Sequence, residues 1–218
     1  MAKGRKRRAP LTRERVLIAA LAYADEHGIE SLSMRKLGEV LGVEAMSLYK
    51  HVANKDEILD GIVDLVATEM ELPRLNGKWK AEMRRRAISA HEVLLRHPWA
   101  TLLIVSRVSA GPAMLRYVDA TIGCLRGAGF SYAAADHAWN ALDNFVYGFT
   151  LHKLKFPLQP EEYAAAAAAY LPHLPVEQFP HLHGMSRQII DGLHDGVNRL
   201  EFGLDLLLDG LEKMPRKG

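Results

Sequence analysis

Apolar residues in the first quarter of the chain recur every three or four positions, the spacing of a helix with one buried face. A first segment of this kind lies between Thr12, which can cap a helix, and Gly28, which can end one. A second, shorter segment begins after Ser33 and stops at Gly42. Its apolar positions are Met34, Leu37, Val40 and Leu41. The pattern predicts two helices with a short connection between them.

Two further helices are predicted before the first strong boundary of the chain. The third runs from about Glu44 to His51, with three apolar residues available to pack inward: Val43, Leu48 and Val52. Asn54 and Glu57 have the spacing of a capping box and open the fourth. Its apolar stripe contains Ile58, Ile62, Leu65 and Val66. Pro73 and the Asn76-Gly77 pair then mark the boundary.

Helical spacing continues through the rest of the chain, and strand-like alternation is essentially absent. The predicted helices are Trp79 to about Arg96, Trp99 to Val108, Pro112 to Arg126, Ala133 to Lys155, Pro160 to Tyr170 and His183 to Lys213. The alanine run from Ala164 to Ala169 is expected to be exposed helix, and the stretch from Pro172 to Pro180 a loop. The sequence therefore predicts an all-α protein.

Composition supports a packed protein in a reducing compartment. The chain has 218 residues, of which 49% are apolar, enough for a sizeable core. Its single cysteine, Cys124, cannot form an internal disulfide, and we find neither a signal peptide nor an apolar run of about 18 residues. We expect a cytoplasmic protein that has no membrane partner.

Positive charge is concentrated at the N-terminus. Residues 1–55 hold eleven Lys/Arg against six Asp/Glu, whereas the remainder is slightly acidic with 17 against 20. Such an asymmetry fits a domain that faces phosphate attached to one that does not. The basic run Lys3 to Arg8, ahead of Pro10, predicts a flexible arm over residues 1–10. This arm either contacts DNA or is a solvated tail.

The segment from Ser33 to His51 has the pattern of a helix-turn-helix, in which the second helix enters the major groove. Gly42 suits the turn because a left-handed backbone costs glycine little. If Leu48 and Val52 face inward, helical spacing turns the remaining side chains of the second helix toward a partner. We therefore predict a three-helix DNA-binding domain over residues 11–57 and a larger helical domain over residues 58–218.

The exposed face of the second helix carries side chains that suit groove recognition. Ala45 and Met46 can touch thymine methyls, Ser47 can bond a base edge or phosphate, and Tyr49 can reach the DNA backbone. The alternative is that Met46 and Tyr49 fill core or interface. Lys55, at the positive end of the fourth helix, favours a phosphate. Arg35 can reach the DNA backbone or form an ion pair with Glu39 on the next turn.

Two neighbouring stretches in the first third of the chain resemble a known family. The segment GIESLSMRKLGEVLGVEAMSLYKHVANKDEILDGI, after the helix RVLIAALAYADEHG, resembles the N-terminal domain of the TetR family of bacterial repressors. The resemblance places the DNA-contacting positions of the family on Arg35, Ala45, Met46, Ser47, Tyr49 and Lys55, with Lys50 and His51 as neighbours. It implies a homodimer that binds double-stranded operator DNA.

The C-terminal half resembles the tetracycline repressor subgroup in HPWATLLIVSRVSAGPAMLRYVDATIGCLRGAGFS and in EFGLDLLLDGLEKM. The resemblance implies a dimer through a four-helix bundle, with about Ala133–Lys155 and Met185–Lys213 from each chain. Positions that hold the drug–magnesium chelate in that subgroup carry Glu71, Arg86, Ala90 and apolar residues near Ile104 and Val105 here. We therefore expect no tetracycline–magnesium site.

Polar and aromatic residues on two of the predicted helices are candidates for an effector pocket, because small-molecule sites combine an apolar wall with a few polar groups. The candidates are His91, Trp139, Asn140, Asn144, Phe145, Phe149 and His152. Ordinary core packing is the alternative for each of them.

Enzyme and metal chemistry find little support in the sequence. The histidines at 173, 181 and 183 lack the Cys/His spacing of a zinc site, and His91 and His97 are six residues apart rather than four. No nucleophile elbow, phosphate-binding loop or dinucleotide fingerprint is present. We expect no catalytic residues, no metal site and no cofactor.

These observations together predict a ligand-responsive transcriptional regulator, a repressor released from a palindromic operator by a small apolar effector. By the family resemblance, effector binding shifts the fourth helix and changes the separation of the two recognition helices. Two alternatives stay open. One is a transcriptional activator with the same fold, and the other is a small-molecule binding protein whose helix-turn-helix is vestigial.

Overall fold

Capping side chains fix where the N-terminal helices of the computed structural model begin; the structure describes residues 10–108 and 111–214. Thr12 Oγ1 accepts from the backbone N–H of Arg15 at 3.2 Å, and Asn54 Oδ1 accepts from that of Glu57 at 2.8 Å. The elements of this half are α1 (Arg13–His27), η1 (Ile29–Ser31), α2 (Met34–Leu41), α3 (Ala45–Leu48) and α4 (Lys55–Glu69). The predicted arm over residues 1–10 lies outside the described residues except for Pro10.

The C-terminal half contains longer helices, and the described residues include no strand. Its elements are α5 (Trp79–Arg96), α6 (Ala100–Ser106), α7 (Pro112–Gly127), α8 (Tyr132–Lys155), η2 (Pro160–Glu162), α9 (Tyr163–Tyr170), η3 (Leu171–His173), α10 (Pro180–Ile190) and α11 (Leu200–Glu212). The all-α prediction is confirmed. None of the described helices is both long enough and apolar enough to cross a bilayer.

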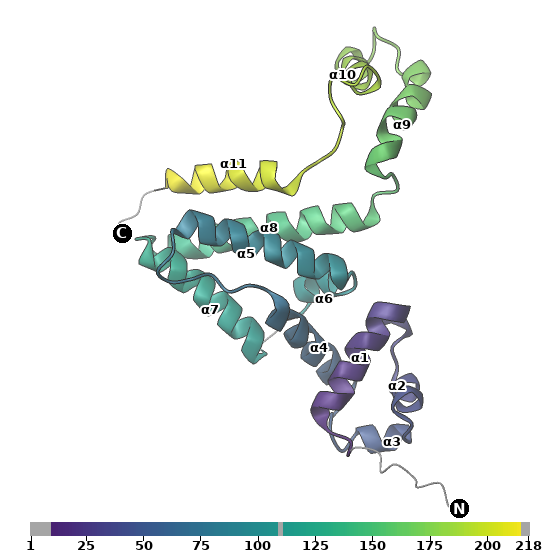
Figure 1. Ribbon diagram of the computed structural model, residues 1–218, viewed down its shortest axis with the longest axis vertical. Coiled ribbons are helices and arrows are strands. Elements are labelled where there is room, and N and C mark those ends of the chain that lie inside the picture. The colour runs from purple at the N-terminus through teal and green to yellow at the C-terminus, as the bar shows by residue number, and fades with distance from the viewer. Residues whose placement is uncertain (1–9, 109–110, 215–218) are drawn as a thin grey trace, which may run out of the picture.

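Helix α4 belongs to the core of both halves. On one side it packs on α1, and on the other it packs on α7, α6 and α5. Its apolar residues Ile58, Ile62 and Val66 are buried in one continuous cluster that extends from α1 to α11. The domain boundary expected between residues 57 and 58 therefore falls inside α4. A movement of α4 would displace residues in both halves of the chain (Figure 1).

The body of the C-terminal half is built on α5 and α8, which lie side by side with α7 and α11 against them (Figure 1). Helices α9 and α10 pack on each other and project away from this body. The alanine run lies in α9 and is mostly exposed, as predicted.

Two predicted helices were wrong in extent. The helix predicted from His183 to Lys213 is divided into α10 and α11 by an irregular segment at residues 191–199. Gly192 and Gly196 in that segment both have a φ of 72°, a left-handed conformation that ends a helix. The third helix, predicted to reach His51, ends at Leu48, whose carbonyl accepts from the N–H of His51 and of Val52 in a closing turn.

Candidate DNA interface and effector site

The helix-turn-helix brings α2 and α3 into close backbone contact. A Cβ atom at Gly38 would lie 2.9 Å from the carbonyl oxygen of Val43, so only glycine fits there without a shift. Gly42 ends α2 with φ 66° and ψ 39°, the left-handed turn that the sequence predicts. Leu48 and Val52 are buried, which confirms the inward face that sets the orientation of α3.

Helix α3 therefore presents its outer face at one end of the molecule (Figure 1). Met46 is 74% exposed and Tyr49 is 46% exposed, so these two side chains do not fill the core of the protomer. The other predicted DNA-contacting residues are exposed at Arg35, Lys50 and Lys55, and half-buried at Ala45, Ser47 and His51. The eight positions lie on α2, on α3 with the turn after it, and on the first turn of α4.

Local ion pairs leave this face positive near α4. The acidic residues that follow Lys55 are bound to other cations, since Asp56 contacts Arg107 at 3.1 Å and Glu57 contacts Arg13 at 3.0 Å. The backbone N–H of Ala53 and the Arg13 side chain hold the pKa of Glu57 below its usual value. On α2, the guanidinium of Arg35 lies 3.8 Å from Glu39, and its side chain remains largely exposed.

The predicted effector residues do not gather in one place. His91 is buried and donates from Nδ1 to Thr150 Oγ1 at 2.7 Å, because the hydroxyl proton of Thr150 goes to the carbonyl of Val146. Burial lowers the pKa of His91. Phe149 lies beside His91, with ring centroids 5.5 Å apart, and Phe145 lies beside Phe149, with ring centroids 5.9 Å apart.

The remaining candidates on α8 lie elsewhere. Asn140, Asn144 and His152 are exposed. His152 stacks on Phe156 with ring centroids 4.9 Å apart and lines a cavity of about 420 Å³ between the end of α8 and the α9–α10 pair. Trp139 instead donates from Nε1 to Oδ2 of Asp143 at 2.6 Å, and the Asp143 side chain lies in the core.

Asp143 is the centre of a buried polar network between α5, α7 and α8 that the sequence interpretation did not select. Its carboxylate is paired with the guanidinium of Arg86, which is 0% exposed, and also accepts from Trp139 and from the hydroxyl of Tyr147 at 3.2 Å. The Arg86 guanidinium lies over the ring of Tyr117, 4.8 Å from its centroid. Burial lowers the pKa of Arg86, but Tyr117 and Asp143 raise it by more, so the group stays charged.

Several donors of this network are unsatisfied. Within the described part of the chain, Nε and Nη1 of Arg86 and the hydroxyl of Tyr117 are buried and have no hydrogen-bond partner. A buried donor without an acceptor costs roughly 1–3 kcal/mol. These three atoms can therefore hold an oxygen acceptor brought by a bound molecule or by water.

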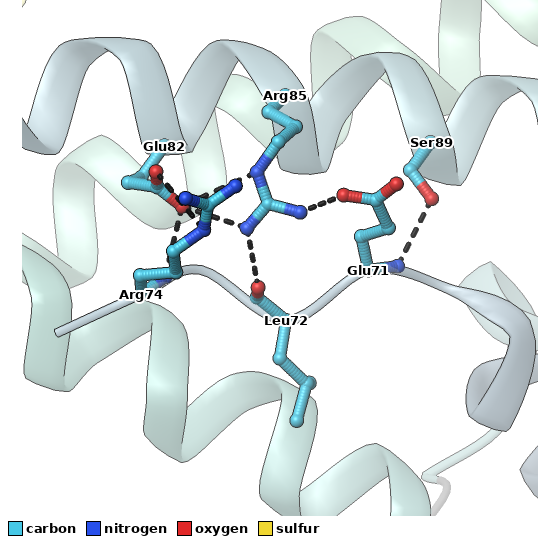
Figure 2. Close-up of polar contacts among 6 residues, drawn as sticks. All are labelled: Glu71, Leu72, Arg74, Glu82, Arg85 and Ser89. Carbon is cyan, nitrogen blue, oxygen red and sulfur yellow. Dashed lines mark hydrogen bonds and ion pairs between the residues drawn. The ribbon is translucent and has the colours of Figure 1, made fainter. Parts of the chain in front are cut away.

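The segment that follows α4, residues 71–74, is held against α5 by polar contacts (Figure 2). The N–H of Glu71 donates to Ser89 Oγ at 2.9 Å, and the Glu71 carboxylate is paired with Arg85. Arg85 also donates to the carbonyl of Leu72 and to Glu82, both at 2.7 Å. Glu71 thus forms an ion pair with Arg85 at the surface of the protein.

Comparisons with known families decide the identity of the fold. Residues 16–62 match the family described as "Bacterial regulatory proteins, tetR family", and residues 72–215 match the one described as "Tetracyclin repressor-like, C-terminal domain". The chain belongs to the TetR family of transcriptional regulators. The first matched region ends within α4 and the second begins shortly after it, so the boundary between them falls at the helix that this TetR-family chain shares between its two halves.

Individual relatives support the assignment to this family. An HTH-type transcriptional regulator of Saccharopolyspora erythraea is 38% identical over 63% of this chain, and the match spans 59% of that protein. The class D tetracycline repressor of Escherichia coli is 32% identical over 94% of this chain and 90% of its own length. The two relatives are named as a transcriptional regulator and a repressor, which confirms the predicted class of function.

Solved structures show the same architecture. ActR, a TetR family protein of Streptomyces coelicolor solved in complex with (S)-DNPA, superimposes with a TM-score of 0.81 at 31% identity. The superposition covers 94% of this chain and 98% of ActR, and a second ActR structure contains actinorhodin. The helical layout of this TetR-family chain is therefore shared along nearly its whole length.

One signal in the sequence could have indicated Arg86. The apolar residues Met83, Ala87 and Ala90 of α5 define a buried face at helical spacing, and Arg86 lies on that face. A charged residue on such a face has to find a partner, because an unpaired buried charge is costly. The partner Asp143 lies 57 positions away in sequence, which no local pattern in a TetR-family chain reveals.

Proposed function

We propose that two copies of this chain bind a palindromic operator with α3 of each protomer in the major groove. The observation that carries this proposal is the outward face of α3, where Met46 and Tyr49 are exposed while Leu48 is buried on the opposite face. Arg35, Lys50 and Lys55 surround that face with positive charge and would contact phosphates. Ala45 and Ser47 would lie nearest the base edges, and His51 beside the backbone.

A second copy of the chain would cover the outer stripe of α11. Phe202 and Leu206, one turn apart on that helix, are 71% and 59% exposed. Exposed apolar side chains at this spacing are typical of a helix–helix interface. With α8, which packs beside α11, this stripe would form the four-helix bundle of a homodimer. The two-fold axis would then make the operator half-sites symmetric.

The effector would bind against the buried network of Arg86, Tyr117 and Asp143. Apolar and aromatic side chains surround these groups, so the effector would be a small and largely apolar molecule. It would carry oxygen acceptors, because the donors left over at Arg86 and Tyr117 require them. Binding would shift α4 through α5 and α7, and operator DNA would be released as the balance between two arrangements changes.

Operator binding is tested by titrating fluorescent duplexes from the region upstream of the gene, at several salt concentrations. The affinity of the dimer should fall steeply with salt, since phosphate contacts release counterions. Lys55→Ala should lower the magnitude of the log–log salt slope by about two per dimer, one for each protomer. Lys155→Ala, a matched change at the far end of α8, should leave the slope unchanged. A Lys55→Ala slope equal to that of wild type would contradict the proposed interface.

Effector chemistry is tested with three planar probes of similar size: naphthalene, 1-naphthoate and 1,4-naphthoquinone. Calorimetric titration should show that the oxygen-bearing probes bind at least about tenfold tighter than naphthalene, the value of one good hydrogen bond. Arg86→Met should remove that difference. Equal affinity for the three probes, or a preference that survives Arg86→Met, would refute the proposed site.

A further inference from the structure

A single buried histidine joins the DNA-binding half to the body. His97 follows the last residue of α5, and its ring nitrogens face carboxylates on two other helices. Nδ1 lies 2.8 Å from Asp25 Oδ1 near the end of α1, and Nε2 lies 3.1 Å from Glu69 Oε1 at the end of α4. The histidine side chain is almost fully buried between them.

Two neighbouring donors complete the contact, and we call this group of five residues the His97 junction. Trp99, at the start of α6, donates from Nε1 to Asp25 Oδ1 at 2.7 Å. Arg96 donates to Glu69 Oε2 at 2.7 Å. The junction thus ties α1 to α4, α5 and α6 at the place where the two halves meet (Figure 1).

The geometry defines the protonation state that makes the junction complete. An ionised carboxylate accepts hydrogen bonds and donates none, so both ring nitrogens need a proton for both contacts to form. Burial raises the pKa of Glu69, but the hydrogen bond from Arg96 and the charge of His97 outweigh this and keep its pKa below the ordinary value. The neutral ring can make one of the two bonds, whereas the imidazolium makes both.

We infer that His97 is a positioning residue for operator binding, which in its protonated form holds the DNA-binding half at a fixed angle to the body. The inference rests on the operator binding proposed above and adds a dependence on pH to it. A dimer has to place two recognition helices in two half-sites at once, so any freedom between the halves must be lost on binding. Loss of the second hydrogen bond restores that freedom, and the operator affinity falls.

The charged groups that face His97 are Asp25 on α1, Glu69 on α4 and Arg96 on α5. Two of them are carboxylates, and each lies within hydrogen-bond distance of one ring nitrogen. A second imidazole that bears on the measured affinity is that of His51, in the proposed DNA interface. A comparison between variants that all keep His51 removes that contribution.

The test measures operator affinity by fluorescence anisotropy from about pH 5 to about pH 8, the range in which an imidazole side chain changes charge. The first variant is His97→Gln, whose side-chain amide has one donor nitrogen beside an acceptor oxygen and so cannot donate to carboxylates on both sides. The matched control is His27→Gln, which changes an exposed histidine at the end of α1. Wild type and His27→Gln should lose at least about tenfold in affinity as pH rises, as for one charge-assisted hydrogen bond. His97→Gln should be weaker at pH 6 and nearly flat.

A second measurement does not depend on DNA. Amide hydrogen exchange at a fixed pH near 6 should be faster in the last turn of α1 in His97→Gln than in wild type. Glu69→Gln, which keeps the shape and removes the charge, replaces His97→Gln if that variant does not fold. A pH profile of His97→Gln parallel to wild type, with unchanged exchange in α1, overturns the inference. Failure of wild type to bind any operator instead contradicts the proposed function, and the exchange comparison still decides the role of His97.

Discussion

Replacing Asp143 with leucine removes the negative charge that faces Arg86 between α5 and α8. The guanidinium is 0% exposed, so its charge would be left buried without a counterion. Breaking a buried pair from one side costs about 3 to 5 kcal/mol. For a chain of this length, a loss of that size lowers Tm by about 6 to 20 °C.

The measurement is urea denaturation followed by circular dichroism at one fixed protomer concentration, because the stability of a dimer depends on concentration. The single variants Asp143→Leu and Arg86→Met are compared with the double variant in a thermodynamic cycle. Removing both charges leaves no buried ion unpaired, so the double variant should be more stable than Asp143→Leu alone.

The coupling energy from this cycle should be about 2 kcal/mol or more. Trp139 and Tyr147, which also donate to Asp143, are half-buried and can be hydrated when the carboxylate is removed. Additive costs, with a coupling energy below about 0.5 kcal/mol, would show that Arg86 and Asp143 do not stabilise each other in the folded protein.

Three further changes test other parts of the account. Tyr49→Ala should abolish operator binding in a gel shift, while size exclusion still reports the dimer. The control Tyr170→Ala, on α9, should bind the operator normally. Operator binding retained by Tyr49→Ala would disprove the assignment of α3. Gly38→Ala should destabilise the helix-turn-helix by about 1–3 kcal/mol in urea, since its Cβ would press on the carbonyl of Val43, and an unchanged midpoint would contradict that contact. Phe202→Asp should convert the dimer to a monomer in analytical ultracentrifugation; a dimer of wild-type affinity would exclude the α11 stripe as the interface.

Local signals were enough to predict most of the helices and the outward face of α3. Thr12, Ser33 and Asn54 each cap the helix that they were expected to begin, because a capping side chain acts within three residues of itself. Gly42 has the left-handed backbone that the turn requires. The outward face of α3 followed from two apolar positions, Leu48 and Val52, whose burial is confirmed.

Features that depend on distant residues could not be predicted in the same way. The two glycines that divide α10 from α11 lie in an apolar stripe that looks continuous, and their positive φ appears only in the folded chain. The pairs Arg86–Asp143 and His97–Asp25 join positions 57 and 72 residues apart. Six of the seven predicted effector residues lie along α8, whereas the buried network draws its groups from α5, α7 and α8.

The most direct test of the central claim is selection of duplexes from a random pool by the purified protein, followed by sequencing. A dimer that reads DNA with α3 should enrich an inverted repeat whose half-site centres are about one helical turn or more apart. The same selection with Tyr49→Ala should enrich nothing. Selection of no inverted repeat by the folded wild-type protein would contradict the account, as would an identical repeat selected by Tyr49→Ala.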